Sequence, residues 1–497
     1  MNKYDFLIIG SGLGGLITGA ILSKEGYEVC IVEKNYQIGG VIQNFVRDGV
    51  IFDTGGHYVG GLDEGQNLHR YFSYLGLIKG LKIQKMDVNH YDIVSFLDNG
   101  MDYPHAMGFD NFVDQLARYF PQEREHLKKY IHHIKETSHQ FPLFNLESNS
   151  YNIFESGLLS QCLEPYLREI THSQRLQNIL AGNNLLYAGE KDKTPFYVHA
   201  LIQYSYLDSS YRFIGGTGQL AHMLAEKIKS HGGHIFTQTD ITSIEIEDKQ
   251  IAHATSHNGT AFKAHYYISN VHPTETFRKI DKNKLPKIYY KRLLNLANTI
   301  SVFSLYLVLK KNTFKYLNHN YYIYRSNDVW NASDYSLKEW PDSCMFFTQP
   351  STNGKYAQGI TILAYMRYDE LKKWQDTDTG NRGADYEAFK KQKAEELLDF
   401  VETRFPDIRA CIKNYYTSTP LTYRDYTATE KGALYGVSRD CNDPYRNMVF
   451  HKSKIPNLFF VGQNTNLHGI MGVTIGSILT CSEFLGLDYL IGQIKKA

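Results

Sequence analysis

Few features of this sequence would tie it to a membrane span, a metal ion or nucleic acid. The 497 residues contain no run of about 18 apolar residues, the length that a spanning helix needs. The 53 Lys and Arg residues are balanced by 52 Asp and Glu residues, so the chain lacks the large positive net charge that is typical of nucleic-acid-binding proteins. The six cysteines are scattered without CxxC or zinc-finger spacing. We therefore expect no metal site, no nucleic-acid partner, and a reducing, cytoplasmic location.

Length and composition indicate a globular protein of more than one domain. A single hydrophobic core rarely grows beyond about 250–300 residues, so a chain of 497 residues predicts two or three units. Hydrophobic residues make up 42% and charged residues 21%, as in ordinary globular proteins, which argues against disorder. The 38 Tyr and 27 Phe residues are many, and they predict either an aromatic core or an aromatic-lined pocket.

A β-α-β unit is predicted at the N-terminus. The apolar run 6–9 is typical of a strand buried on both faces, and it leads into a G-x-G-x-x-G pattern at 10–15. A helical stretch follows at 16–24, and a second buried strand at 29–32 ends in Glu33. Strand, glycines, helix, strand and acid occur in the order and spacing of a dinucleotide-binding fingerprint.

Each residue type in this unit suits a specific part of a bound dinucleotide or of the turn that holds it. Gly10 permits the tight turn, Gly12 lets the backbone approach a pyrophosphate, and Gly15 allows the helix to pack closely on the strand. The N-terminus of the helix favours the negative charge of the pyrophosphate. Glu33 is expected to accept hydrogen bonds from a ribose hydroxyl, so the unit predicts a bound dinucleotide.

Two further glycine-rich segments extend this predicted site. Gly39 and Gly40 follow the second strand, and they would offer backbone N–H groups to a cofactor without a shielding side chain. Near the C-terminus, the buried-strand pattern 457–461 ends in Gly462, and a glycine-rich stretch then leads into a helix expected at 477–485. The N-terminal end of that helix would favour negative charge on a bound ring.

The chain resembles the phytoene desaturase flavoproteins and, within them, the retinol saturase and carotenoid isomerase branch. Four blocks carry the resemblance: 10–60, 211–218 with 268–270, 419–436, and 461–476. In the first block the family motif is matched at Gly10, Gly12, Gly14, Gly15, Leu16, Leu22, Glu33, Gly39, Gly40, Gly49, Asp53 and Gly55. Gly19 stands where the motif usually has Ala, and the usual Arg before the glycine pair is absent. Gln463 resembles the saturase branch, whereas most relatives place Asp there.

The resemblance implies an α/β fold with a discontinuous Rossmann-type FAD-binding domain and a mixed α+β substrate domain. The FAD-binding domain would comprise residues 1–75, 205–275 and 425–497, and the substrate domain residues 76–204 and 276–424. The cofactor would be one non-covalent FAD. Its binding residues would be Gly10, Gly12, Leu13, Gly14, Gly15, Glu33, Lys34, Gly39, Gly40, Gly55, Gly56, His57, Ile241, Gly462, Gln463, Gly472 and Val473.

Four residues are candidates for catalysis near the flavin. His57 and Tyr58 follow the double glycine at the end of the extended motif, so either could relay a proton. Arg212 precedes the glycine turn at 215–216 and is expected to face the substrate or the flavin. His468 lies in the C-terminal loop that is expected to face the flavin. Packing, a loop hydrogen bond or an ion pair is the alternative role for these side chains, and the sequence assigns no essential acid or base.

The expected activity is FAD-dependent oxidoreduction of carbon–carbon bonds in a long polyene or isoprenoid lipid, as in a carotenoid desaturase or a retinol saturase. A flavin-dependent carotenoid cis–trans isomerase and an amine oxidase-like enzyme are the alternatives. A flavin-free lipid carrier would not need the intact glycines or Glu33. The electron partner stays open, with a quinone or oxygen possible as acceptor. Direct NAD(P)H binding is not expected, because a second dinucleotide motif and a redox cysteine pair are both missing from the sequence.

A water-insoluble substrate also predicts reversible contact with a membrane surface. Without a spanning helix, such contact would use an exposed apolar patch in the substrate domain. The candidate segment is 151–170, where apolar residues recur near helical spacing at Phe154, Leu158, Leu159, Leu163 and Leu167. A buried core helix is the alternative interpretation of the same pattern.

Overall fold

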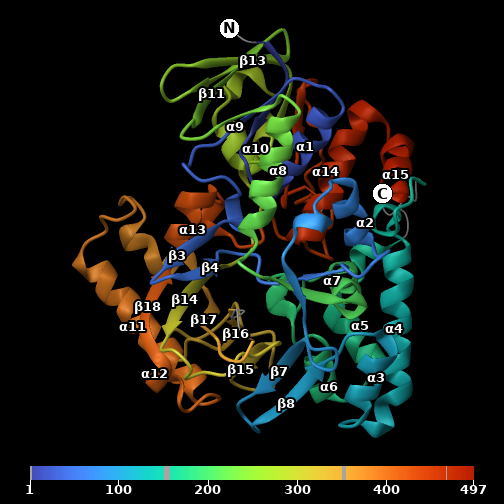
Figure 1. Cartoon of the computed structure of the whole chain (residues 1–497), viewed down its shortest axis with the longest axis vertical. Coiled ribbons are helices and arrows are strands. Elements are labelled where there is room, and N and C mark those ends of the chain that lie inside the picture. Colours follow the sequence, from blue (N-terminus) through green and yellow to red (C-terminus); the bar gives the residue numbers. More distant parts are fainter. Residues whose placement is uncertain (1–2, 150–156, 350–353, 466) are drawn as a thin grey trace.

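The computed structural model describes residues 3–149, 157–349, 354–465 and 467–497. Two large sheets organise these residues. In Figure 1 the first sheet lies in the upper half, around β11 and β13, and the second lies in the lower half, around β14–β17, β7 and β8.

The first sheet collects strands from three distant parts of the chain. Its order is β10-β2-β1-β13-β12-β11, and β19 also pairs with β13. The pairs β10–β2, β2–β1, β1–β13 and β13–β19 are parallel, whereas β11, β12 and β13 pair antiparallel. The strands are β1 (Lys3–Ile9), β2 (Val29–Val32), β10 (His234–Phe236), β11 (Ile241–Glu247), β12 (Gln250–Ser256), β13 (Ala261–Ser269) and β19 (Leu458–Phe460). The parallel core is that of a Rossmann-type sheet.

Both faces of this sheet are covered, which explains why its first strand has no polar alternation. Phe6 and Ile8 pack with helices on one face, while Leu7 and Ile9 pack with apolar side chains from the antiparallel strands and two helices on the other. The helices on the first face are α1 (Leu13–Lys24), α8 (Gly218–Ser230), α14 (Gly469–Leu485), α15 (Leu487–Lys496) and α2 (Asn67–Tyr74). Those on the second are α9 (Pro273–Arg278) and α10 (Lys287–Leu294).

The second sheet has the order β18-β14-β17-β16-β15-β7-β8 and is mostly antiparallel. Only the pair β15–β7 is parallel within this order. Its strands are β7 (Asp92–Phe96), β8 (Met101–His105), β14 (Ser301–Leu309), β15 (Asn320–Tyr324), β16 (Ser343–Thr348), β17 (Gly359–Met366) and β18 (Ile412–Ser418). Every residue of β7 and of β14–β17 is buried, so this sheet too is covered on both faces.

Helices flank the second sheet on either side (Figure 1). One group comprises α3 (Phe109–Ala117), α4 (Arg124–His139), α5 (Leu163–Ile170), α6 (Gln174–Leu180) and α7 (Phe196–Asp208). The other comprises α11 (Ala384–Glu402), α12 (Ile408–Cys411) and the start of α13 (Pro420–Thr427). Two small sheets complete the fold: the hairpin of β3 (Asn44–Arg47) and β4 (Val50–Asp53), and β5 (Val59–Gly60) with β9 (Ser210–Phe213) and β6 (Ile83–Lys85). The domain bounds stay a prediction.

Two helices begin earlier than the sequence predicts. The first starts at Leu13 instead of 16, and the C-terminal helix starts at Gly469 instead of 477. Glycines in the predicted loop therefore lie inside the first turns of α14. A Cβ atom added at Gly472 would lie 2.7 Å from the Leu467 carbonyl oxygen, so close packing explains this glycine and a loop is not required.

Cys162 and Cys441 form a disulfide, which the scattered cysteine pattern did not predict. The two residues are 279 positions apart, and their spacing gave no signal of pairing. The other cysteines of the chain, Cys30, Cys344, Cys411 and Cys481, are buried free thiols. The disulfide joins the start of α5 to the loop before β19.

The predicted membrane-docking segment at 151–170 is also wrong in the part that the structure describes. Residues 150–156, including Phe154, lie outside the described residues. Leu159, Leu163 and Leu167 are 6%, 0% and 1% exposed, and they pack in the hydrophobic core beside the second sheet. The helical spacing therefore marks a core helix. Among the helices in the described ranges, none combines the length and apolar content that crossing a membrane requires.

A buried arginine connects the small β9 sheet to the second large sheet. Arg212 is 2% exposed. Its Nη1 donates to the Thr348 carbonyl and, at 3.2 Å, to Thr348 Oγ1. Its Nη2 donates to the His319 carbonyl and to Asn320 Oδ1, each at 2.6 Å. One guanidinium thus satisfies acceptors at the ends of two neighbouring strands.

The same network continues to a fully buried carboxyl group. Asn320 Nδ2 donates to Asp92 Oδ1 at 2.8 Å, and the Tyr58 hydroxyl donates to Asp92 Oδ2 at 2.7 Å. Burial raises the pKa of Asp92 to about 7, although the hydrogen bonds from Tyr58 and Asn320 and the charge of Arg212 act in the opposite direction. The network therefore ties the segment after β4 to the second sheet.

We predict that Arg212→Met lowers the free energy of unfolding by about 3 kcal/mol, because the buried acceptors lose charged donors. Urea denaturation followed by circular dichroism measures the change. The control is Arg118→Met, at an exposed arginine, which should alter stability by less than about 0.5 kcal/mol. Equal effects of the two substitutions would contradict the structural role of Arg212.

Candidate functional site

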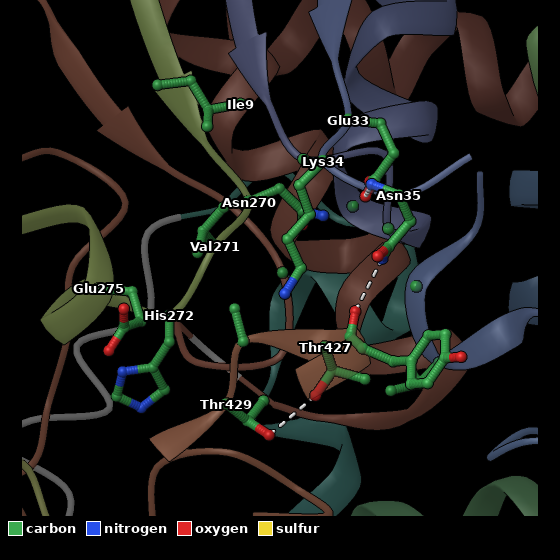
Figure 2. A pocket seen from close by; sticks show the side chains of 18 of the residues that line it. Ile9, Glu33, Lys34, Asn35, Asn270, Val271, His272, Glu275, Thr427 and Thr429 are labelled. Atoms are coloured by element: carbon green, nitrogen blue, oxygen red, sulfur yellow. Dashed lines mark hydrogen bonds between the residues drawn. The ribbon is translucent and has the colours of Figure 1, made fainter. Parts of the chain in front are cut away.

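An elongated cavity of about 240 Å³ lies where three parallel strands of the first sheet end. Gly10 follows β1, Asn270 follows β13 and Gly462 lies two residues after β19, and all three line this cavity. Figure 2 shows Glu33, Lys34 and Asn35 on one side of it, and His272 and Glu275 on the other. Ligands of α/β sheets bind at this carboxyl-end edge.

The wall of the cavity next to α1 is bare backbone. A Cβ atom added at Gly12 would lie 2.6 Å from Asn270 Nδ2, and one added at Gly14 would lie 2.9 Å from the Gly462 backbone nitrogen. The N-terminus of α1 starts here and has no side-chain cap. Unshielded N–H groups at a helix N-terminus bind phosphate groups, so this wall fits a pyrophosphate.

The carboxylate of Glu33 is held firmly at the end of β2. Its Oε2 accepts hydrogen bonds from the Ser11 backbone N–H at 2.9 Å and from Ser11 Oγ at 2.7 Å. Its Oε1 accepts from the Asn35 backbone N–H at 2.9 Å. Glu33 therefore lines the cavity in a fixed position, as a ribose-binding carboxylate requires.

Lys34 and Ile241 line the same end of the cavity. Lys34 Nζ donates to the Asp425 carbonyl at 2.5 Å, and burial lowers its pKa, whereas the nearby carboxylates, Asp240 first, raise it. Ile241 begins β11 and is 1% exposed. An apolar side chain and a cation at one end suit a flat base and an adjoining phosphate.

A second cavity, which we call the chamber, continues from the first toward the second sheet. Leu13, Val41, Gln463 and Val473 line both cavities. The chamber has a volume of about 170 Å³ and is lined by residues 55–60, by residues 467–473 at the start of α14, by α7, and by β16 and β17. The N-terminus of α14 therefore faces the chamber.

Two of the predicted catalytic residues line the chamber as neutral side chains. The His57 ring stacks on the Phe347 ring, with centroids 4.4 Å apart, and neither of its nitrogens has a hydrogen-bond partner among the described residues. Burial, with a smaller contribution from Arg212, lowers the pKa of His57 to about 3. The Tyr58 hydroxyl donates a hydrogen bond to Asp92 Oδ2. Burial raises the pKa of Tyr58 well above its usual value.

His468 is a third candidate on the chamber wall. Its Nε2 lies 3.1 Å from the Leu186 carbonyl oxygen, which can only accept, so Nε2 carries the proton and Nδ1 is the free base. Burial lowers the pKa of His468 to about 4. Its ring lies 4.7 Å from that of Tyr435, whose hydroxyl donates to the Leu185 carbonyl at 2.8 Å.

Three of the predicted site residues line neither cavity. Arg212 lies in the network beneath the chamber wall, where it is bonded to backbone and amide groups. Gly15 packs against β1, and a Cβ atom there would lie 2.2 Å from the Gly10 carbonyl oxygen. Gly39 donates its backbone N–H to the Ser11 carbonyl and pairs with Gly12. The other predicted cofactor-binding residues line one or both cavities.

Sequence reasoning missed several lining residues. Asn270 follows a strand that ends beside Gly10, and this shared edge is a signal that could have identified it. Val41 lines both cavities directly after the glycine pair. The second sheet also contributes lining residues, namely Met345, Phe347 and Leu363. The sequence around these three residues has no local pattern that predicts contact with the chamber.

Comparison with known proteins gives a consistent family. Residues 13–480 match the family model described as flavin containing amine oxidoreductase. The chain belongs to this family. It is 25% identical to the all-trans-retinol 13,14-reductase of Rattus norvegicus, over 97% of this chain and 86% of that protein. It is 24% identical to prolycopene isomerase 1 of an Oncidium hybrid cultivar, over 100% of this chain and 86% of that protein.

Solved structures share the fold. Wild-type putrescine oxidase bound to putrescine superposes with a TM-score of 0.65 at 14% identity, covering 97% of this chain and 99% of that one. The cofactor is FAD. The two cavities fit it: bare glycine backbone and a fixed Glu33 suit the dinucleotide half, and the chamber that continues from them suits the flavin ring.

We predict that Gly12→Val abolishes FAD binding, because the added side chain occupies the space that the pyrophosphate needs against the bare wall. The ratio of flavin absorbance to protein absorbance after purification measures the cofactor content. The matched control is Gly492→Val in α15, where an added Cβ atom meets nothing within 4 Å. A yellow Gly12→Val protein with full flavin content would show that the cofactor lies elsewhere.

Proposed function

We propose that this chain is an FAD-dependent oxidoreductase that acts on carbon–carbon bonds of a long polyene or isoprenoid lipid. One observation carries the proposal: the described residues that line the chamber include no Asp, Glu, Lys or Arg. Its two histidines have lowered pKa values and are neutral at pH 7. A chamber without charge favours a hydrocarbon over a polar metabolite, because an unpaired ion would be costly to bury there.

The names of the relatives support this substrate class. One relative is named a retinol reductase and another a prolycopene isomerase, and both match along nearly the whole chain. Aromatic side chains of the chamber, including Tyr206, Phe347 and Tyr435, offer flat faces to a conjugated chain. Desaturation would need a quinone or oxygen as electron acceptor, and saturation would need an outside reductant.

In this proposal the flavin supplies hydride transfer, and the protein supplies orientation and a place for the proton. His468 is the chamber residue best suited to accept a proton from a substrate carbon. Its tautomer is fixed by the Leu186 carbonyl, which leaves Nδ1 unprotonated, and its lowered pKa keeps it neutral. In the reverse direction the same nitrogen would return the proton.

A cis–trans isomerase is the second candidate, because the chamber and the prolycopene isomerase relatives suit the same substrates. Amine oxidation would fit the family description. Against it, no carboxylate of a described lining residue is available to hold a protonated amine in the chamber. Contact with a membrane surface is part of the proposal, since the substrate would be delivered from a lipid phase.

We predict electron exchange between the flavin and polyenes under anaerobic conditions. Dithionite-reduced enzyme mixed with all-trans-retinol should regain its flavin absorbance and give a product heavier by two hydrogens. Oxidised enzyme mixed with the partly saturated polyene should bleach if the reaction runs toward desaturation. Mass spectrometry distinguishes the candidates, since an isomerase leaves the mass unchanged. Bleaching by a primary amine, with no response to any polyene, would favour the amine oxidase alternative.

We predict that His468→Gln lowers the rate of electron exchange at least about 100-fold while FAD content stays the same. Glutamine keeps a donor for the Leu186 carbonyl but removes the basic nitrogen. Stopped-flow reduction or reoxidation of the flavin gives the rate. A rate within twofold of the unaltered enzyme would remove His468 from the proposed proton transfer.

A further inference from the structure

A third hollow, which we call the tyrosine groove, lies on the other side of the segment that follows β2. Its volume is about 580 Å³. It is walled by α13, the N-terminal part of α11, the hairpin strand β3 and the edge strand β18. Seven aromatic residues contribute to its lining: Tyr36, Phe45, Tyr306, Tyr415, Tyr416, Tyr423 and Tyr426. None of the four residues considered for catalysis lines it.

The groove is larger than the space beside the flavin. The chamber measures about 170 Å³, below the roughly 300–1,000 Å³ of sites that enclose a drug-sized ligand, and the flavin ring must also lie there. A long lipid therefore needs room outside the chamber. The groove alone among the three cavities named here falls within that range.

The three cavities meet at one residue. Val41 lines the dinucleotide cavity, the chamber and the groove. The neighbouring residues Thr54 and Gly55 lie on opposite sides of the same wall, since Thr54 lines the groove and Gly55 the chamber. Thr54 Oγ1 donates to the Val41 carbonyl at 2.8 Å, so a residue that lines the groove is bonded to the residue that all three cavities share.

Three of the groove tyrosines, Tyr306, Tyr416 and Tyr423, have hydroxyls that are hydrogen-bonded within the protein, which leaves their rings as contact surface. The Tyr423 hydroxyl donates to the Thr54 carbonyl at 3.2 Å, and the Tyr416 hydroxyl donates to Asp48 at 3.2 Å. Tyr306 shares a 3.3 Å hydrogen bond with Ser418. Rings held in this way offer apolar area to a hydrocarbon chain at little further cost in side-chain entropy.

The rim of the groove carries unpaired positive charge. Glu387 is the one acid in the lining, and it forms an ion pair with Lys390 at 2.9 Å. Arg47 lies 5.3 Å from the Phe45 ring and 5.4 Å from the Tyr416 ring, and the described residues include no acidic partner for it within 4 Å. Lys391 is exposed and likewise has no acidic partner in the described part of the chain. Neither cation is in an ion pair with a described residue, although the Asp48 carboxylate is bonded to the Tyr416 hydroxyl beside Arg47.

We propose that the tyrosine groove binds an amphiphile with a single hydrocarbon chain and a carboxylate or phosphate end. The chain lies along the aromatic wall toward Val41, and the anionic end is held by Arg47 and Lys391. This inference rests on the proposed function, because it identifies the groove as the outer part of the lipid site. It adds that the preferred lipid carries an acidic end.

The test uses the FAD-loaded full chain and cis-parinaric acid, a conjugated fatty acid whose fluorescence increases in an apolar site. Arg47→Glu combined with Lys391→Glu should weaken its binding at least about tenfold, because attraction becomes repulsion. The matched control reverses the charge of two exposed cations outside the groove, Arg118→Glu with Lys413→Glu, and should change binding less than twofold. Flavin content verifies that each variant is folded.

A bulky substitution in the groove and an uncharged ligand test the two parts of the proposed site separately. Thr417→Trp fills the groove and should also weaken binding at least tenfold, whereas Lys413→Trp on the same strand should not. The methyl ester of parinaric acid should bind the unaltered protein more weakly than the acid does, and the charge reversal should change the binding of the ester less than twofold. Equal binding of acid and ester, or binding unaffected by both groove variants, would overturn the proposal.

Two outcomes separate this inference from the proposed function. Groove-dependent binding without any electron exchange between polyenes and the flavin supports the groove and removes the redox function. If polyenes exchange electrons with the flavin at the same rate in the groove variants as in the unaltered enzyme, the redox function is supported and the groove is removed from the lipid site. If the charge-reversed variant loses binding to phosphatidylglycerol vesicles but keeps its affinity for monomeric parinaric acid, the cations serve a lipid surface and the single-ligand site is wrong.

Discussion

The structure depends on the close approach of three strand ends around bare glycine backbone. Gly12, Gly14 and Gly462 surround the side chain of Asn270 so tightly that Cβ atoms at these glycines would lie within 2.7 Å of its amide. This approach exposes the N-terminus of α1 without a capping side chain. A dinucleotide could then accept hydrogen bonds from N–H groups that the protein leaves open, and we propose that the Glu33 carboxylate, held by Ser11, orients it.

The second sheet supplies apolar side chains that form one wall of the chamber. Met345, Phe347 and Leu363 reach the chamber from this sheet, and the Arg212 network beneath Tyr58 anchors that wall to the segment after β4. Both Nη atoms of Arg212 donate to acceptors within the wall. It also disfavours a proton on His57, so the buried cation helps to keep the chamber neutral.

The parts of the site that sequence reasoning predicted are local in the chain. The glycines at 10–15, Glu33 and the Gly462 segment follow from strand, turn and helix patterns that span fewer than 40 residues each. Contacts between distant segments were out of reach. Met345, Phe347 and the Cys162–Cys441 disulfide are brought into place by pairing across the fold. The leucines of α5 have the same spacing in a core helix as on a docking face.

The contrast between a neutral chamber and a cationic groove has a physical consequence for how a lipid can lie. An anionic end cannot enter the chamber, because its lining offers no opposite charge and burial of an unpaired carboxylate is costly. At the groove, Arg47 and Lys391 meet the same anion at the edge of water, where its desolvation is small. A lipid with an acidic end would therefore keep that end at the groove, and only uncharged parts of a lipid suit the chamber.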